Sequence, residues 1–472
     1  LTSHVWSAVC ERFLLTLLSL DKPYCLCVST MHHSTNTVEL LEDDATAVPF
    51  CKHGPALLFR RIGTAGKNSG RPFYACSGCR KRKDCVLFVW KDDLLSRPLP
   101  DSKTWDHVRN EVVPASTHDQ LYQKLRSVSK RPPSERFFCC RKLLARTELG
   151  AHRGHAVTTP VEDDDLRRPS RLINADVTNT TKAQYFFSDA CVTFVCSLLE
   201  QQHFESVICV GAPSIHEYLR ESRPQLPSIL LDIEQTYEQF YGPSEFAWFN
   251  MFNGFFFRGS SAEETVQRHL SSGTRCALLI DPPFGGLVDA IARTLAKMVS
   301  YAAAVGSTLS ILWFFPYFNE KRIVEAMPSL RMLDFAVDYR NHVTFNESGR
   351  TKGSPVRIFT DIPPGQVKLP SDRYRYCYDC DRWVALSNTH CDICKDCTSK
   401  DGGPYRHCDE CGVCVKLSHV HCPRCQSCLP QGHSCGSTGV VCFLCKMPGH
   451  KSVQCSANRK GQKNAGKRKR TE

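Results

Sequence analysis

No run of about 18 apolar residues occurs in this 472-residue sequence, and its absence excludes a transmembrane helix on the sequence pattern. The early apolar run Phe13–Leu20 is short, follows Glu11 and precedes no small-x-small cleavage pattern, so we expect no secretory signal peptide. Hydrophobic residues make up 42% and charged residues 23% of the chain, which is typical of a folded protein with roughly three or four domains. Residues 1–45 match no motif, and we expect them to be disordered or to be mis-called sequence.

Acidic residues are absent from the segment Arg459–Arg470, which contains seven lysines and arginines. The whole chain has 60 basic and 48 acidic residues, so this segment supplies more than half of the net charge of +12. A basic tail of this kind, residues 457–472, suits nucleic-acid binding or nuclear import, although it can also serve only to solubilise the chain. We expect the protein in the nucleus and nucleolus, with the cytoplasm as a further location.

Cysteine is abundant: the chain has 28 cysteines, and fifteen of them lie within Cys377–Cys455. They recur as C-x2-C pairs with histidines between them, a spacing that lets a tight turn aim two thiolates at one tetrahedral zinc ion. Disulfide frameworks rarely repeat this spacing, so the pattern indicates zinc sites and a reducing compartment. In the module at 371–436 the candidate ligands are Cys377, Cys380, His390, Cys391, Cys394, Cys397, His407, Cys408, Cys411, Cys414, His421, Cys422, Cys425, Cys428, His433 and Cys435.

This module contains the pattern H-C-x2-C-x2-C three times, and in that it resembles the DHHC-type and CHY-type zinc fingers. The string Ser418–Cys422 lacks the D-H-H-C sequence of the acyltransferases, and their membrane context is missing. We therefore expect a structural module that holds three or four zinc ions. Spacing alone does not say which ligands share an ion.

A zinc knuckle is predicted at 437–456 from the spacing C-x2-C-x4-H-x4-C, whose four ligands are Cys442, Cys445, His450 and Cys455. Knuckles of this kind bind single-stranded nucleic acid, with bases resting on exposed apolar side chains, and Phe443 is placed for that contact. The alternative is a knuckle that only packs on another domain.

Residues 46–100 resemble the GRF zinc finger in the patterns C-x-H-G, G-R-x-F-Y-x-C and a final cysteine before alternating aromatic residues. The candidate ligands are Cys51, His53, Cys76 and Cys85, and we expect Cys79 to be a free thiol. A weaker candidate lies in the linker at 101–170, where Cys140, His152 and His155 form three quarters of a C2H2 finger. Cys139 adjoins Cys140 directly, and adjacent cysteines chelate one ion poorly, so this site is either distorted or lost.

Between residues 171 and 370 cysteine becomes rare and short apolar runs alternate with helical patterns. The expected strands are Ser206–Val210, Ile229–Leu231, Cys276–Ile280 and Leu309–Phe315, and the expected helices are Ser188–Gln202 and Leu287–Ala304. This rhythm predicts an α/β domain with a doubly wound, Rossmann-like parallel sheet. Two later runs, Phe335–Phe345 and Val356–Thr360, predict a terminal antiparallel hairpin.

Ligands of such sheets bind at the carboxyl ends of the strands, where this sequence has Gly211, Asp232 and Asp281. An acid that ends the second strand suits a ribose diol, since its two oxygens accept from two hydroxyls. The residues after Gly211 do not continue as G-x-G-x-x-G, because Pro213 replaces the second glycine. The pattern therefore favours S-adenosylmethionine, which has no phosphate, over a dinucleotide.

The sequence Asp281-Pro282-Pro283-Phe284 matches the [DNS]-P-P-[YFW] motif of the amino-directed adenine and cytosine N-methyltransferases. The exocyclic amine of adenine is a weak nucleophile, because its lone pair is delocalised into the ring. Asp281 and the Pro282 carbonyl oxygen can accept its two N–H bonds, Pro283 adds a stiff backbone, and Phe284 can stack on a flipped base. Positioning is then the main catalytic contribution, and no catalytic metal is needed.

Taken together, the order of these motifs over residues 48–456 resembles the animal family of CCHC-zinc-knuckle rRNA N6-adenosine methyltransferases. The resemblance implies methylation of one adenosine in large-subunit (28S) ribosomal RNA, presented by a structured RNA loop and held by the fingers. It implies S-adenosyl-L-methionine as cofactor and about five to seven structural zinc ions. It also implies a cofactor site lined by Gln184, Tyr185, Phe186, Phe187, Gly211, Asp232, Asn250, Met251 and Asp281.

Two alternatives stay open on the sequence. Messenger RNA, small nuclear RNA or DNA can replace rRNA as the substrate of the same chemistry. A zinc-finger RNA-binding protein with an inactive methyltransferase fold is the second alternative, and the intact Gly211, Asp232 and Asp281–Phe284 count against it. A RING-type ubiquitin ligase is excluded, because the repeated cysteine pattern lacks RING spacing.

Overall fold

The computed structural model describes residues 38–43, 48–62, 68–79, 84–96, 108–113, 115–173, 185–341 and 354–435. The chain divides into two compact units, a small one formed by Leu1–Glu39 and Arg60–Arg71 and a large one formed by the rest. In the small unit, Arg60 pairs with Glu39 over 3.5 Å. Among the described residues, no helix has both the length and the apolar character that a membrane span requires.

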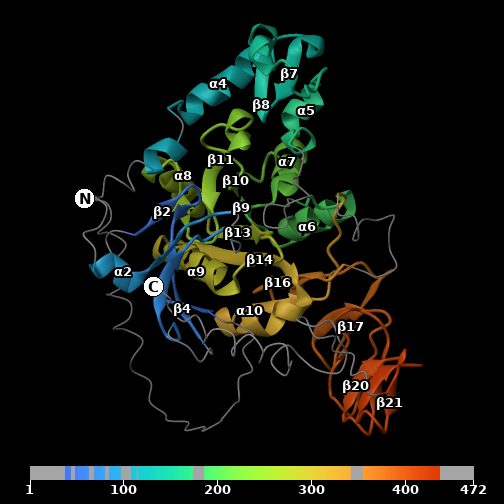
Figure 1. Cartoon of the computed structure of the whole chain (residues 1–472). Helices are drawn as coiled ribbons and strands as arrows, with labels where there is room; N and C mark the ends of the chain where they lie inside the picture. The colour runs from blue at the N-terminus through green and yellow to red at the C-terminus, as the bar shows by residue number, and fades with distance from the viewer. Residues whose placement is uncertain are drawn as a thin grey trace, which may run out of the picture. The chain divides into compact units, whose positions relative to one another are not determined.

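The large unit is built on an eight-stranded sheet with the order β12-β11-β10-β9-β13-β14-β16-β15 (Figure 1). Its five central strands run parallel, and they are β9 (Ser206–Val210), β10 (Ser228–Asp232), β11 (Phe246–Asn250), β13 (Arg275–Ile280) and β14 (Thr308–Pro316). Each is an almost continuous apolar run, as expected of strands that are covered on both faces. The predicted α/β class is thereby confirmed, and β11 is a strand that the sequence analysis did not predict.

Helices cover both faces of this sheet, and alternate side chains of each strand enter different cores. Cys209 of β9 packs in one core with residues of α6 (Asp189–Gln201) and α7 (Pro213–Ser222). Its neighbour Ile208 packs in the other core with residues of α8 (Ser260–Ser271) and α9 (Val288–Ala304). Pro213 occupies the first turn of α7, where a backbone N–H has no partner within the helix, so the proline costs no hydrogen bond. The short α10 (Glu320–Ala326) follows β14.

The antiparallel end of the sheet differs from the predicted hairpin. Strand β16 (Val356–Thr360) pairs with β14 and with β15 (Arg331–Leu333), and the described part of the predicted partner Phe335–Phe345 forms no strand, so that prediction was wrong for residues 335–341. The described part of that segment keeps one bond to β16, from the Val337 N–H to Val356 O over 3.2 Å, and then runs beside Phe186–Ser188, where the Ser188 N–H donates to Asp338 O over 2.9 Å. The other edge strand, β12 (Phe255–Phe256), is antiparallel to β11.

The elements before the sheet are short. They are β1 (Val38–Leu40), β2 (Phe50–Cys51), β3 (Gly54–Pro55), β4 (Leu57–Arg61), β5 (Pro72–Ala75), β6 (Phe88–Trp90), α2 (Lys91–Ser96), α4 (His118–Val128), β7 (Arg136–Cys139), β8 (Lys142–Ala145) and α5 (Asp163–Arg167). Strands β2 and β3, β5 and β6, and β7 and β8 form antiparallel pairs. These hairpins carry the cysteines of the two N-terminal fingers: Cys51 and Cys139 end strands β2 and β7, and Cys76, Cys85 and Cys140 lie in the loops.

Three antiparallel hairpins follow the sheet and contain the Cys/His-rich module. They are β17 (Tyr374–Cys377) with β18 (Arg382–Ala385), β19 (Tyr405–Cys408) with β20 (Val413–Lys416), and β21 (His419–Cys422) with β22 (Ser427–Pro430). The module contacts the sheet at the buried ion pair of Asp334, which follows β15, and Arg357 of β16, which lie 3.3 Å apart. Asp334 also accepts from the Ala385 N–H over 3.3 Å, and Arg357 donates to Lys400 O over 3.3 Å.

Candidate active site and metal centres

The end of β9 and the end of β13 meet closely at Gly211, whose φ is +64°. A Cβ at this position would lie 3.0 Å from the carbonyl oxygen of Asp281 and 3.1 Å from Cε of Met251. Both the left-handed backbone and the close approach therefore require glycine. This glycine creates the narrow cradle at the carboxyl edge of the sheet that the sequence analysis assigned to the cofactor.

Asp281 follows β13 directly, and its main-chain N–H donates to Val210 O over 3.0 Å. Its Oδ1 accepts a hydrogen bond of 2.9 Å from the hydroxyl of Tyr339. Burial raises the pKa of Asp281 well above its usual value, and the Tyr339 bond opposes that rise. Tyr339 was not predicted from the sequence, because nothing local to it signals a contact with a residue 58 positions away.

The motif continues into a tight turn, in which the Gly286 N–H donates to Pro283 O over 2.7 Å. Phe284 then lies among aromatic rings, with its centroid 6.0 Å from that of Tyr185 and 6.1 Å from that of Tyr339. Tyr185 and Phe284 are partly exposed. These two rings give the site partly accessible flat surfaces beside the Asp281 carboxylate, which a planar base can stack on.

The neighbouring strand ends carry the other predicted cofactor residues. Asp232, the last residue of β10, is buried, and its Oδ1 accepts from the Glu234 N–H over 2.8 Å, which fixes the direction of the carboxylate. Met251 follows β11 and faces Gly211. These residues therefore lie on adjacent strands at one edge of the sheet, where a nucleoside with a ribose diol is expected.

Asn250 and Phe187, two residues predicted to line the cofactor site, make contacts with other parts of the chain. The Asn250 amide donates to His53 O over 2.7 Å and to Ser77 Oγ over 2.9 Å, so it joins β11 to the first finger. Phe187 is fully buried and stacks on Tyr339 at 5.2 Å. Phe186 is also buried. Gln184 lies outside the described residues.

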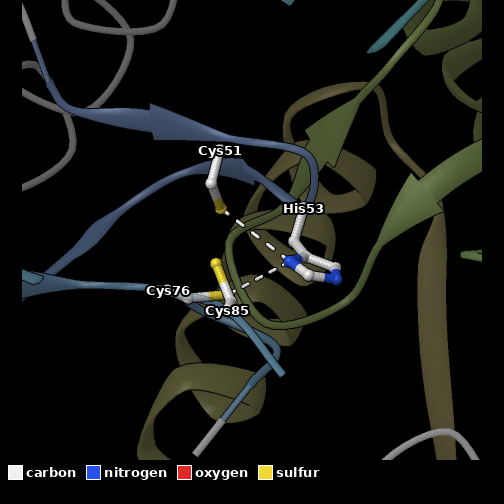
Figure 2. A group of neighbouring side chains, drawn as sticks. All are labelled: Cys51, His53, Cys76 and Cys85. Carbon is white, nitrogen blue, oxygen red and sulfur yellow. Dashed lines mark hydrogen bonds between the residues drawn. The ribbon is translucent and has the colours of Figure 1, made fainter. Parts of the chain in front are cut away.

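The first metal centre gathers the four side chains predicted for the GRF-type finger, Cys51, His53, Cys76 and Cys85 (Figure 2). Their ligand atoms all lie within 4.8 Å of one another. Figure 2 shows the His53 ring with Nδ1 toward the thiols, 3.4 Å from Cys76 Sγ and 3.9 Å from Cys51 Sγ. Three thiols and one imidazole within this distance suit a tetrahedral zinc ion. Cys79, which we predicted to be free, lies 3.6 Å from His53 Nε2.

The second centre includes a ligand that the sequence analysis left out. Cys139 joins Cys140, His152 and His155 in one group whose ligand atoms all lie within 4.8 Å. Adjacent cysteines can converge here because Cys140 and Arg141 both have positive φ, 49° and 59°, in the two-residue turn of the β7–β8 hairpin. The buried Nδ1 of His152 has no hydrogen-bond partner among the described residues, as expected for a nitrogen that faces a metal.

The Cys/His-rich module arranges its ligands in an interleaved series. Each group takes a C-x2-C pair from one repeat and the histidine and last cysteine from the next. The groups are Cys377, Cys380, His390 and Cys397; Cys391, Cys394, His407 and Cys414; and Cys408, Cys411, His421 and Cys428. The contacts of Cys422 with Cys435, and of Cys425 and Cys435 with His433, extend the series to a fourth group. The donor set of every group suits zinc.

The predicted knuckle ligands Cys442, Cys445, His450 and Cys455, like the basic tail, lie outside the described residues.

Comparison with known proteins adds two family models and a set of relatives. Residues 178–352 match the family described as probable N6-adenine methyltransferase, and residues 49–94 match the GRF zinc finger. The human protein named rRNA N(6)-adenosine-methyltransferase ZCCHC4 is 42% identical over 431 residues, which cover 88% of this chain and 83% of the relative. The Xenopus tropicalis protein of the same name is 41% identical, with 87% and 86% covered. The mouse protein is 39% identical, with 75% and 72% covered.

Proposed function

Since this chain belongs to the family of rRNA N(6)-adenosine-methyltransferases, we propose that it methylates N6 of one adenosine in large-subunit (28S) ribosomal RNA. The observation that carries the proposal is the position of Asp281–Phe284 at the carboxyl end of β13, beside the glycine cradle at Gly211. The methyltransferase domain implies S-adenosylmethionine, which supplies an electrophilic methyl group when it is bound.

The residues of the chain have distinct tasks in this reaction. Asp281 and the carbonyl oxygen of Pro282 accept the two N–H bonds of the target amine and direct its lone pair toward the methyl group. Phe284 and Tyr185 stack on the adenine once the nucleotide is out of its stack. Asp232 holds the ribose of the cofactor. The bond from N6 to the methyl carbon would form as the bond from that carbon to the sulfonium sulfur breaks, S-adenosylhomocysteine would leave, and the amine proton would pass to solvent, so no step requires a metal ion.

Zinc has a structural task in this proposal. The donor sets support one ion in the first finger, one in the second and four in the Cys/His-rich module, and the knuckle pattern adds one. This is the upper end of the range of about five to seven that we expected. We propose that the fingers hold a structured rRNA loop around the site, while the basic tail either contacts RNA or directs the chain to the nucleus and nucleolus.

The proposal is tested by incubating the purified full chain with S-adenosylmethionine that carries a labelled methyl group and with total RNA. After size separation, label is expected in 28S rRNA, as N6-methyladenosine in the digested nucleosides. Label in messenger or small nuclear RNA instead would move the activity to another substrate. Label in no RNA, with cofactor bound, would favour an inactive RNA-binding protein.

A further inference from the structure

We propose that Tyr339 is a positioning residue for methyl transfer, which holds the Asp281 carboxylate in the orientation that meets the target amine. This inference rests on the proposed function, and it adds a residue that lies outside the D-P-P-F motif. Its basis is one directed contact, from the Tyr339 hydroxyl to Asp281 Oδ1 over 2.9 Å. Among the described residues, no other side chain donates a hydrogen bond to this carboxylate.

The Tyr339 ring is held so that its hydroxyl has little freedom to leave this position. The side chain is completely buried. One face stacks on Phe187, with ring centroids 5.2 Å apart and an interplanar angle of 22°. Tyr185 and Phe284 lie 5.9 and 6.1 Å away, so the same ring borders the surfaces assigned to the target base. A displacement of Tyr339 would therefore disturb both the carboxylate and its neighbours.

The backbone at Tyr339 is fixed by pairing with a distant segment. The Ser188 N–H donates to Asp338 O, and the Arg340 N–H donates to Phe186 O, each over 2.9 Å. These bonds flank Tyr339 on both sides and form the bridge between Phe187 and Tyr339. Ser188 also caps α6, since its Oγ accepts from the Cys191 N–H over 3.3 Å. The hydroxyl is thus aimed at Asp281 from an isolated β-bridge whose backbone is hydrogen-bonded on both sides of Tyr339.

The hydrogen bond from Tyr339 affects both the orientation and the charge of the Asp281 carboxylate. A donor that occupies Oδ1 leaves Oδ2 as the oxygen that accepts from the amine, and it selects one rotamer of the carboxylate. It also favours the charged form, so the Tyr339 bond opposes the increase in the Asp281 pKa that burial causes. Two other titratable groups face this pair: Cys191 from α6, which interacts with both Asp281 and Tyr339, and Tyr185, whose ring centroid lies 5.9 Å from that of Tyr339. Neither supplies a positive charge, so the tyrosine hydroxyl is the main stabiliser of the carboxylate.

The test is Tyr339→Phe in the full zinc-loaded chain, with Tyr237→Phe as the matched control. Tyr237 is another completely buried tyrosine, and its hydroxyl has no partner among the described residues. We expect Tyr339→Phe to lower the single-turnover rate of methyl transfer about 10–100-fold, as loss of an orienting partner does. The acidic limb of its pH–rate profile should move to higher pH, because Asp281 loses the bond that favours its ionised form. The affinity for S-adenosylmethionine, measured by calorimetry, should stay within twofold of wild type. Tyr237→Phe should change neither the rate nor the profile.

Two results would overturn the inference. A Tyr339→Phe chain with the wild-type rate and pH profile would show that the hydroxyl does not position Asp281. A loss of rate with an unmoved profile, together with lower thermal stability and weaker cofactor binding, would show that the tyrosine is only part of the core. These failures differ from failure of the proposed function, in which the wild-type chain itself transfers no methyl group to RNA.

Discussion

The side-chain amide of Asn250 donates a hydrogen bond of 2.7 Å to the main-chain carbonyl oxygen of His53. His53 belongs to the first metal centre, and Asn250 ends β11 immediately before Met251, which faces the Gly211 cradle. Asn253 adds a second amide that donates to Pro55 O over 2.9 Å. The first finger therefore contacts the loop that borders the cofactor edge, and its metal centre lies one hydrogen bond away from that loop.

Asn250→Ala is expected to weaken binding of S-adenosylmethionine about fivefold, which corresponds to about 1 kcal/mol. The buried carbonyl oxygen of His53 would keep only the longer bond of 3.3 Å from the Asn253 amide, so the free energy of unfolding should also fall by about 1 kcal/mol. Calorimetric titration and urea unfolding measure the two effects. Asn388→Ala is the matched control, because Asn388 is equally buried and donates to Ser399 O over 2.8 Å in the Cys/His-rich module. Asn388→Ala should lower the free energy of unfolding but keep the wild-type affinity for S-adenosylmethionine. Equal losses of affinity in both variants would show that the bond from Asn250 to His53 O has no specific effect on the cofactor site.

The interleaved ligand groups predict how zinc is lost from cysteine variants. Cys380 and Cys397 share one group, whereas Cys391 belongs to the next. Elemental analysis should therefore find about one ion fewer in the Cys380→Ser, Cys397→Ser double variant, since two broken ligands empty one site. The Cys391→Ser, Cys397→Ser double variant should lose about two. The reverse order of losses would mean that each repeat binds its own ion.

The second finger gives a separate test of the adjacent cysteines. Cys139→Ser should reduce the zinc content by about one ion, because Cys139 completes the group of Cys140, His152 and His155. Cys79→Ser is the control, since Cys79 lies near the first centre but outside its group of four ligands. It should leave the zinc content unchanged. If Cys139→Ser keeps all its zinc, the second centre uses a different ligand or binds no metal.

Removal of residues 457–472 should reduce the salt dependence of RNA binding while cofactor affinity is retained. The segment Arg459–Arg470 contains seven cations. Each phosphate that it neutralises contributes roughly 0.7–0.9 to the slope of log affinity against log salt, so four contacts change that slope by about 3. Binding to rRNA fragments at several salt concentrations measures the slope. An unchanged slope would assign the tail to nuclear or nucleolar targeting rather than to RNA contact.

Much of the sheet could be predicted because its strands are short apolar runs that end at Gly211, Asp232 and Asp281, and local pattern suffices for such elements. Strand β11 was missed, since its aromatic residues and the preceding turn gave no clear alternation. The contact of Tyr339 with Asp281 could not be predicted, because it depends on backbone pairing with Phe186–Ser188 rather than on β16.

The metal centres also differ in how far their ligands could be predicted from local sequence patterns. The candidate ligands of the first finger were indicated by its resemblance to the GRF zinc finger, and the structure brings those four side chains together. The pairing in the Cys/His-rich module does not follow, because every C-x2-C pair has the same spacing and the partners come from the next repeat. The sequence analysis did not include Cys139 as a ligand, because adjacent cysteines usually chelate one ion poorly. The positive φ values of Cys140 and Arg141 bring Cys139 to the site.

The measurement that tests the central claim most directly is single-turnover transfer of a labelled methyl group to rRNA by wild type and by Asp281→Ala. The wild-type chain should label N6 of one adenosine. The variant should lose at least about 100-fold in rate, as expected when a preorganised polar partner of the reacting group is removed. Its RNA binding and thermal stability should be retained, because among the described residues the Asp281 side chain contacts only Tyr339. Transfer at the wild-type rate by Asp281→Ala would contradict the mechanism and with it the assignment of Asp281–Phe284 as the active site.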